Sequence, residues 1–169
     1  LAAVILSYRT ELLGILHEGL WMLHRGKMPR GTKPDMKRRR MLLFLLAASV
    51  PLVLAAIFDS YLTPLYTNTF FIGFMLILTG FLLLAADRLG HGRKNETSAT
   101  LSDALVVGLA QAVAVVPGLS RSGATISAGM LRGFERSFAV RFSFLLSIPA
   151  VIGAALYTLL KAVLAGVDW

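Results

Sequence analysis

The sequence predicts an all-α, polytopic membrane protein with transmembrane helices and one re-entrant helix-loop-helix. Three observations support this fold class. Of the 169 residues, 56% are hydrophobic and only 15% are charged, and the mean hydropathy is +0.72. Long stretches without a charge recur along the chain, and basic residues gather between them. We expect a single integral membrane domain over residues 1–169, because an ordinary soluble domain carries more charge.

The positive charge is concentrated in one segment. There are 17 Lys and Arg against 9 Asp and Glu, which gives a formal net charge of +8. Residues 25–40 contain eight of the basic residues and only Asp35 in opposition. Because this segment lies between two hydrophobic stretches, it predicts membrane topology and argues against nucleic-acid binding. The absence of cysteine excludes disulfides, zinc-thiolate sites and thiol nucleophiles.

Four membrane crossings are expected, and the first covers about residues 1–16 and continues as a helix to about His24. The chain opens on Leu1 with neither Met nor a basic signal-peptide region, so we expect an internal fragment whose first span is cut. The second crossing covers about residues 41–58, which are eighteen residues without a charge. Pro51 should kink this helix without ending it.

The third and fourth crossings are also defined by uncharged stretches. Residues 63–68 have turn chemistry, so the third crossing should cover about residues 69–86, with Tyr61 and Tyr66 at the membrane interface. The fourth should cover about residues 138–160, which include nineteen consecutive uncharged residues. Both stretches approach the roughly 20 residues that a helix needs to cross a bilayer.

Residues 103–132 are expected to enter the membrane and to return to the same side. Uncharged stretches of seventeen and ten residues flank Arg121, and neither is long enough to cross comfortably. A hydrophobic segment that is broken by Pro and Gly and carries one ionisable residue is typical of a re-entrant hairpin. We predict half-helices at 103–116 and 124–132 with a loop at 117–123.

The basic segments also predict the orientation of the chain. Residues 25–40 and the basic residues between 88 and 94 should face the cytoplasm, which leaves Asp59 outside. The re-entrant pair starts and ends on the cytoplasmic side, where a second basic cluster follows it. Its tip at residues 117–123 should therefore point toward the outside face.

The tip has the composition of an oxyanion site. Arg121 can bind two phosphate oxygens in a fork, and three hydroxyl side chains can donate to other oxygens, with Thr125 in the first turn of the second half-helix. Two glycines permit positive φ and close backbone approach, and a half-helix start favours anions. The structural alternative is a buried arginine satisfied by carbonyls, although the cost of an intramembrane charge favours function. The residues of this tip are Arg121, Ser120, Ser122, Thr125, Gly118 and Gly123.

This tip resembles the second signature, PGxSRSGATI, of the undecaprenyl-pyrophosphate phosphatases, which are bacterial membrane enzymes associated with bacitracin resistance. The resemblance continues in the FSFLLSIP segment at residues 142–149 and in Gly153 and Ala154. It covers about residues 108–154.

The resemblance implies hydrolysis of undecaprenyl diphosphate to undecaprenyl phosphate and phosphate, which recycles the lipid carrier for cell-wall synthesis. It implies that Arg121 binds the pyrophosphate, that Ser120 and Ser122 assist it, and that Thr125 hydrogen-bonds a phosphate oxygen. The family pattern also places a glutamine on the preceding half-helix. Gln111 stands about one and a half helical turns before the tip, so it either faces the same cavity or pairs with a neighbouring helix.

Part of the family pattern has no match in this chain. The first signature, a glutamate-rich half-helix followed by a PxSSxGH loop, is missing, and so are the closing spans after Trp169. We therefore expect the ligands of a divalent cation, Mg²⁺ or Ca²⁺, and the catalytic histidine to lie elsewhere, and the chain alone to be inactive. His17, Glu18 and His24 lack HExxH spacing, and His91 lies in a polar loop, so these residues are interpreted as solvated or interfacial.

The resemblance also implies a setting and partners. The setting is the bacterial plasma membrane, with the tip facing outward in an architecture of two inverted repeats that each hold a re-entrant pair. The expected partner is a polyprenyl diphosphate lipid, and a homodimer is compatible with the family. Phe142 and Phe144 are candidates to line the groove for the lipid tail, although packing is the commoner role of such residues. The main alternative is a transporter or flippase that binds polyprenyl phosphate without hydrolysis. A purely structural membrane protein is the second alternative.

Overall fold

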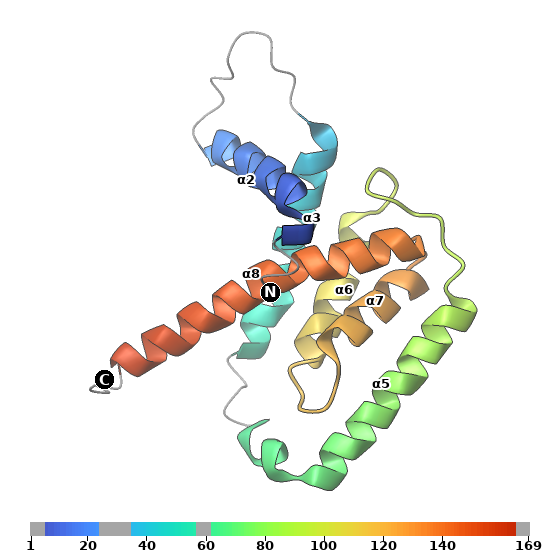
Figure 1. The fold of residues 1–169 in the computed structure, drawn as a ribbon, viewed down its shortest axis with the longest axis vertical. Coiled ribbons are helices and arrows are strands. Elements are labelled where there is room, and N and C mark those ends of the chain that lie inside the picture. Colours follow the sequence, from blue (N-terminus) through green and yellow to red (C-terminus); the bar gives the residue numbers. More distant parts are fainter. Residues whose placement is uncertain (1–5, 24–34, 57–61, 165–169) are drawn as a thin grey trace.

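The computed structural model describes residues 6–23, 35–56 and 62–164, and these residues are predominantly helical. Apart from one isolated pairing of Lys94 with Phe134, the described part of the chain contains no β-structure, which confirms the all-α class. Figure 1 shows the arrangement of the elements. In chain order they are α2 (Arg9–Leu23), α3 (Met36–Ala56), the 3₁₀ helix η1 (Thr63–Thr67), α5 (Thr69–Leu89), α6 (Leu101–Val113), α7 (Arg121–Leu131) and α8 (Arg136–Leu164).

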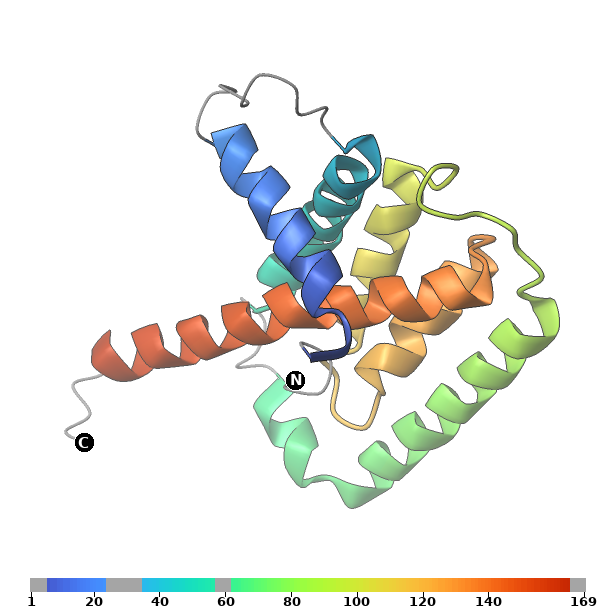
Figure 2. The ribbon, with the colours of Figure 1, turned by 45° about the horizontal axis from the view of Figure 1, so that its top comes forward.

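Within the described residues, two helices, α5 and α8, are long and apolar enough to cross a membrane. Most of α5 is exposed, and Phe70 at its start is 94% exposed. In both views α5 runs along the edge of the molecule and the C-terminal half of α8 projects away from the other helices (Figures 1 and 2). Exposed apolar surface of this extent is unfavourable in water, so it supports a membrane setting.

The start of α5 and the continuation of two helices through proline agree with the sequence analysis. The third predicted span begins where expected, because the Asn68 side chain accepts a hydrogen bond from the Phe71 N–H at 3.1 Å and caps α5. Helix α3 continues through Pro51, and α8 continues through Pro149. His24, Asp59 and Tyr61 lie outside the described residues.

The segment that was expected to be re-entrant forms a helical hairpin whose boundaries differ from the prediction. The first helix ends at Val113, before the expected residue 116, and the second begins at Arg121, so residues 121–123 are helical and not part of the loop. The reason is a local cap, since the Ser120 hydroxyl accepts a hydrogen bond from the Gly123 N–H at 3.2 Å. Thr125 consequently lies in the second turn of α7 and not in the first.

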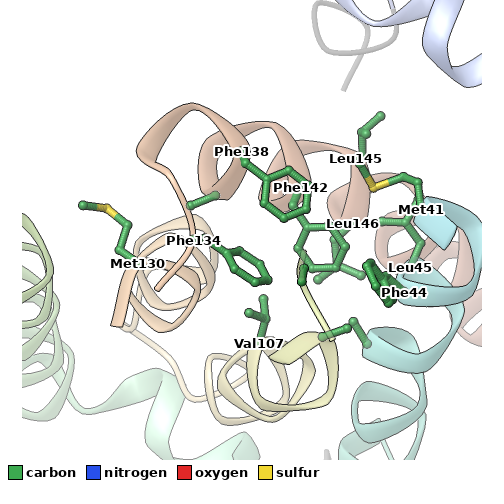
Figure 3. Close-up of a cluster of buried hydrophobic side chains, with 14 of the residues drawn as sticks. Met41, Phe44, Leu45, Val107, Met130, Phe134, Phe138, Phe142, Leu145 and Leu146 are labelled. Carbon is green, nitrogen blue, oxygen red and sulfur yellow. The ribbon is translucent and has the colours of Figure 1, made fainter. Parts of the chain in front are cut away.

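A cluster of buried side chains joins α3, α6, α7 and α8 (Figure 3). At its centre are three phenylalanines, with ring centroids 4.8 Å apart for Phe134 and Phe138 and 6.0 Å apart for Phe138 and Phe142. Phe142 is buried in this cluster, so it has the packing role that is common for phenylalanine and does not line a lipid groove. The cluster holds the N-terminal half of α8 against the hairpin.

Helices α3 and α6 approach each other closely at two small residues. A Cβ placed on Gly108 would lie 2.4 Å from the carbonyl oxygen of Ala48 and 2.7 Å from its Cα, which is too close for any side chain. Small residues permit such close packing, which is the usual means of helix association in membranes. Gly108 therefore sets the distance between α6 and α3.

A buried carboxylate joins the two helices of the hairpin at its open end, which is the end opposite the connecting loop. Asp103 accepts hydrogen bonds from Lys94 Nζ at 2.9 Å and from Arg132 Nε at 2.9 Å, and it forms a capping box with Thr100. Burial by itself would raise the pKa of Asp103, but the hydrogen bonds from Lys94, Thr100 and Arg132 outweigh it and lower the pKa to about 2. The carboxylate therefore stays ionised and ties the start of α6 to the end of α7.

We predict that Gly108→Ala destabilises the fold by roughly 1–3 kcal/mol, because the added methyl group must push α6 away from the backbone of α3. The measurement is denaturant unfolding of the protein in detergent micelles. Gly80→Ala on α5 is the control, since a Cβ at that position meets nothing within 4 Å. Equal stability of the Gly108→Ala variant and the native protein would contradict the close contact.

The Asp103 cluster predicts a dependence of stability on pH. The folded pKa of about 2 is below the value of 3.8 that is usual for aspartate, so the stabilisation by the carboxylate is present above pH 3.8 and is lost as the pH falls toward 2. The shift corresponds to roughly 2 kcal/mol. We expect the Tm difference between the native protein and Asp103→Asn to be large at pH 5 and to narrow toward pH 2.

The control for this measurement is Asp87→Asn, which removes an exposed ion pair with Arg136 and should have little effect on Tm. A Tm difference between the native protein and Asp103→Asn that stays constant from pH 5 to pH 2 would show that the carboxylate is not the titrating group.

Candidate functional site

A polar cavity of about 380 Å³ lies between α6, α7 and α8. It brings together four of the predicted site residues. Gln111 lies on α6, and Arg121, Ser122 and Thr125 lie on α7. Helix α8 supplies the opposite wall. The cavity is lined by Gln111, Arg121, Ser122, Thr125, Ser143, Phe144, Ser147 and Val151.

Arg121 is the first residue of α7 and lies where two cavities meet. It lines the polar cavity and also an apolar cavity of about 300 Å³ that is enclosed mainly by α3, η1 and α8. Among the described residues, no carboxylate forms an ion pair with its guanidinium, and no carbonyl accepts a hydrogen bond from it. The structural alternative of a carbonyl-satisfied arginine therefore has no support in the described part of the chain.

Gln111 lines the polar cavity with a buried side chain. The side chain is 1% exposed, and its Nε2 is buried with no hydrogen-bond partner among the described residues. An unpaired buried donor is unfavourable by about 1–3 kcal/mol. The alternative of a pairing with a neighbouring helix is therefore not seen for this nitrogen in the described part of the chain.

Thr125 contacts a residue that the sequence analysis missed. Its hydroxyl lies 2.5 Å from the hydroxyl of Ser143 on α8, and both side chains are buried. A signal was present in the sequence, because Ser143 and Ser147 are four residues apart and so share one face within a strongly apolar stretch of the helix.

The other three predicted site residues do not line the polar cavity, and they hold the tip against α5 instead. The Ser120 N–H donates to the Thr79 hydroxyl at 3.1 Å, and the Ser120 hydroxyl caps α7. Gly118 adopts a φ of +88°, and a Cβ there would lie 2.6 Å from the carbonyl oxygen of Ile72. Gly123 is helical, so its predicted use of positive φ is wrong.

The acidic and histidine side chains near the N-terminus do not form a metal site. His17 is exposed and accepts a hydrogen bond from Trp21 Nε1 at 2.9 Å. Glu18 is buried and pairs with Arg39 at 3.0 Å, so its interpretation as a solvated residue is wrong. Across the described residues, no group of three His, Asp or Glu side chains is placed to hold a metal ion.

These features define an all-helical protein with long apolar helices and a cavity suited to an oxyanion at the tip of a short hairpin. Residues 1–168 match the family described as bacitracin resistance protein BacA. The chain belongs to this family.

Curated relatives support the same assignment. The chain is 44% identical over 131 residues to an undecaprenyl-diphosphatase of Thermodesulfovibrio yellowstonii, which covers 77% of the chain and 50% of the relative. It is 38% identical over 162 residues to an undecaprenyl-diphosphatase of Nocardioides sp., which covers 94% of the chain and 59% of the relative. It is 41% identical over 162 residues to an undecaprenyl-diphosphatase of Anaeromyxobacter sp., which covers 95% of the chain and 51% of the relative. The chain spans about half the length of these relatives.

Proposed function

We propose that this chain carries the pyrophosphate-binding part of an undecaprenyl diphosphatase, which releases phosphate from undecaprenyl diphosphate and returns the monophosphate carrier to cell-wall synthesis. The observation that carries this proposal is the position of Arg121 between a polar and an apolar cavity. A polyprenyl diphosphate has the same division into a charged head and an apolar tail. The printed names of the relatives support this choice of substrate.

The polar cavity provides the groups that phosphoryl transfer requires for positioning and for stabilisation of charge. The Arg121 guanidinium binds two phosphate oxygens in a fork, and the Gln111 amide donates to a third. Ser122 lies one residue beyond Arg121 in the first turn of α7, where N–H groups and the helix dipole favour an anion. Ser120 and Gly118 contribute by fixing the tip to α5.

The nucleophile and the general base are not assigned to the described residues. The family resemblance implies a Mg²⁺ or Ca²⁺ ion. The described residues do not fit such an ion, because they offer no cluster of carboxylates or histidines around the cavity.

The apolar cavity accommodates the part of the polyprenyl chain that lies nearest to the diphosphate. Its walls come from α3, from Tyr66 of η1, and from the segment of α8 between Pro149 and Tyr157. At about 300 Å³ the cavity is too small for the whole lipid, so the remaining isoprene units lie among the exposed apolar helices.

We further propose that the hairpin enters the membrane as a re-entrant pair, which belongs to one of two inverted repeats. Helices α6 and α7 have 13 and 11 residues, and at 1.5 Å per residue each spans less than the roughly 30 Å hydrocarbon core. Their open end lies at Asp103, where Lys94 and Arg132 gather, and the tip is at the opposite end. By the positive-inside rule, the open end faces the cytoplasm and the tip faces outward.

We predict opposite labelling of the two ends of α5, which is a convenient test because the chain has no native cysteine. Thr67→Cys in η1 should react with a membrane-impermeant maleimide in intact cells, and Thr97→Cys should react only after permeabilisation. Both positions are exposed. Thr67 also reports on the tip, because the neighbouring Tyr66 hydroxyl lies 3.4 Å from the Val115 carbonyl. The reverse pattern of labelling would invert the proposed orientation.

We predict that Arg121→Ala lowers kcat/KM for phosphate release from a polyprenyl diphosphate by about 100-fold or more, because two charge-assisted hydrogen bonds are lost. Arg121→Lys should recover only part of the activity, since lysine cannot form the fork. The assay uses the full-length protein in detergent micelles. Arg136→Ala, which removes an exposed arginine paired with Asp87, is the matched control and should retain activity.

Two outcomes would overturn the proposal in different ways. Normal hydrolysis by the Arg121→Ala variant would remove Arg121 from the site. If the native protein binds the diphosphate but releases no phosphate, the transporter or flippase alternative is favoured.

A further inference from the structure

Two buried hydroxyl groups meet across the contact between α7 and α8. Thr125 Oγ1 and Ser143 Oγ lie 2.5 Å apart, at the short end of the range for O–H···O bonds. Thr125 is 2% exposed and Ser143 is 4% exposed, and both line the polar cavity. Ser143 has no role in the function proposed above.

The protons of this pair can be counted, because each hydroxyl donates only once. Thr125 Oγ1 lies 3.0 Å from the carbonyl oxygen of Arg121 and 3.2 Å from that of Ser122, and either can accept its proton. If Thr125 donates to a carbonyl, Ser143 donates to Thr125 and presents only lone pairs to the cavity. If Thr125 donates to Ser143, the proton of Ser143 is available to the cavity.

An anion in the cavity selects the second arrangement, because phosphate oxygens accept hydrogen bonds and repel lone pairs. We propose that the Ser143 hydroxyl is a further substrate-binding group, which donates to the phosphate held by Arg121. Thr125 is then a positioning residue that acts through Ser143 and directs its O–H into the cavity. This inference rests on the proposed function and changes the expected role of Thr125 from direct to indirect.

Ser143 is held in place by core residues that lie beside it on α8. Its neighbour Phe142 and the nearby Leu146 are buried in the aromatic and aliphatic cluster (Figure 3). A hydroxyl on such a fixed helix loses little freedom when it binds a ligand. Ser147, one turn further on, differs because its hydroxyl donates to the Phe144 carbonyl at 2.6 Å, so its proton is already used.

We expect Ser143→Ala to lower kcat/KM for phosphate release about 10- to 100-fold in the full-length protein, the usual loss for one hydrogen bond to a charged group. Thr125→Val, which keeps the shape but removes the hydroxyl, should show a loss of the same kind, and Thr125→Ser should restore activity to within about 3-fold. The double variant Thr125→Val with Ser143→Ala should be no worse than Ser143→Ala alone, because the two residues act as one unit.

A purely structural hydrogen bond between the helices predicts a different result. In that case Ser143→Ala would lower Tm while kcat/KM of the folded protein stayed at the native value, and the inference would be overturned. Additive losses in the double variant would also overturn it, because Thr125 would then act independently. Ser143→Cys, which keeps nearly the same size but is a weak donor, tests the same point if the alanine variant fails to fold.

Two controls separate this inference from the function on which it rests. Ser137→Ala removes an exposed hydroxyl from the same helix, where it donates to Glu135, and should retain native activity. Hydrolysis that survives Arg121→Ala would defeat the proposed function itself. Hydrolysis that is lost in Arg121→Ala but native in Ser143→Ala would defeat only the role of Ser143.

Discussion

The interaction on which the hairpin depends is the ion pairing of Asp103. Helices of 13 and 11 residues are only marginally stable on their own, so the pair depends on tertiary interactions between the two helices. The buried carboxylate supplies such an interaction by joining Lys94, which comes before α6, to Arg132, which caps the end of α7. Removal of either cation would leave a buried charge with fewer partners, which is far less favourable than the intact cluster.

The tip at the other end of the hairpin has the opposite electrostatic character. Asp103 has two cations, whereas Arg121 has no carboxylate partner among the residues that the structure describes. The paired charge of Asp103 stabilises the fold, whereas Arg121 is the group that we propose binds the substrate, since a charge at membrane depth is costly without a function. Gln111, whose buried Nε2 has no partner among the described residues, lines the same cavity as Arg121.

Packing on three sides determines where these groups lie. Gly108 lets α6 approach the backbone of Ala48 on α3, and Gly118 lets the tip approach Ile72 on α5. The phenylalanine cluster holds α8 against the hairpin. The sequence analysis treated Gly118 as part of the binding site, but a glycine that permits close packing and one that permits close approach of a ligand have the same sequence signal.

The sequence alone determined the all-α class, the apolar helices, the start of α5 and the hydrophobic hairpin with its single arginine, because hydropathy, capping residues and an isolated charge are local signals. It also placed four of the cavity-lining residues in the site. Only the tertiary structure decided that Glu18 is a buried ion-pair partner, that Phe142 belongs to the core and that Ser143 faces Thr125. Each of these depends on which helix packs against which, and that contact is not encoded in the spacing of residues along one segment.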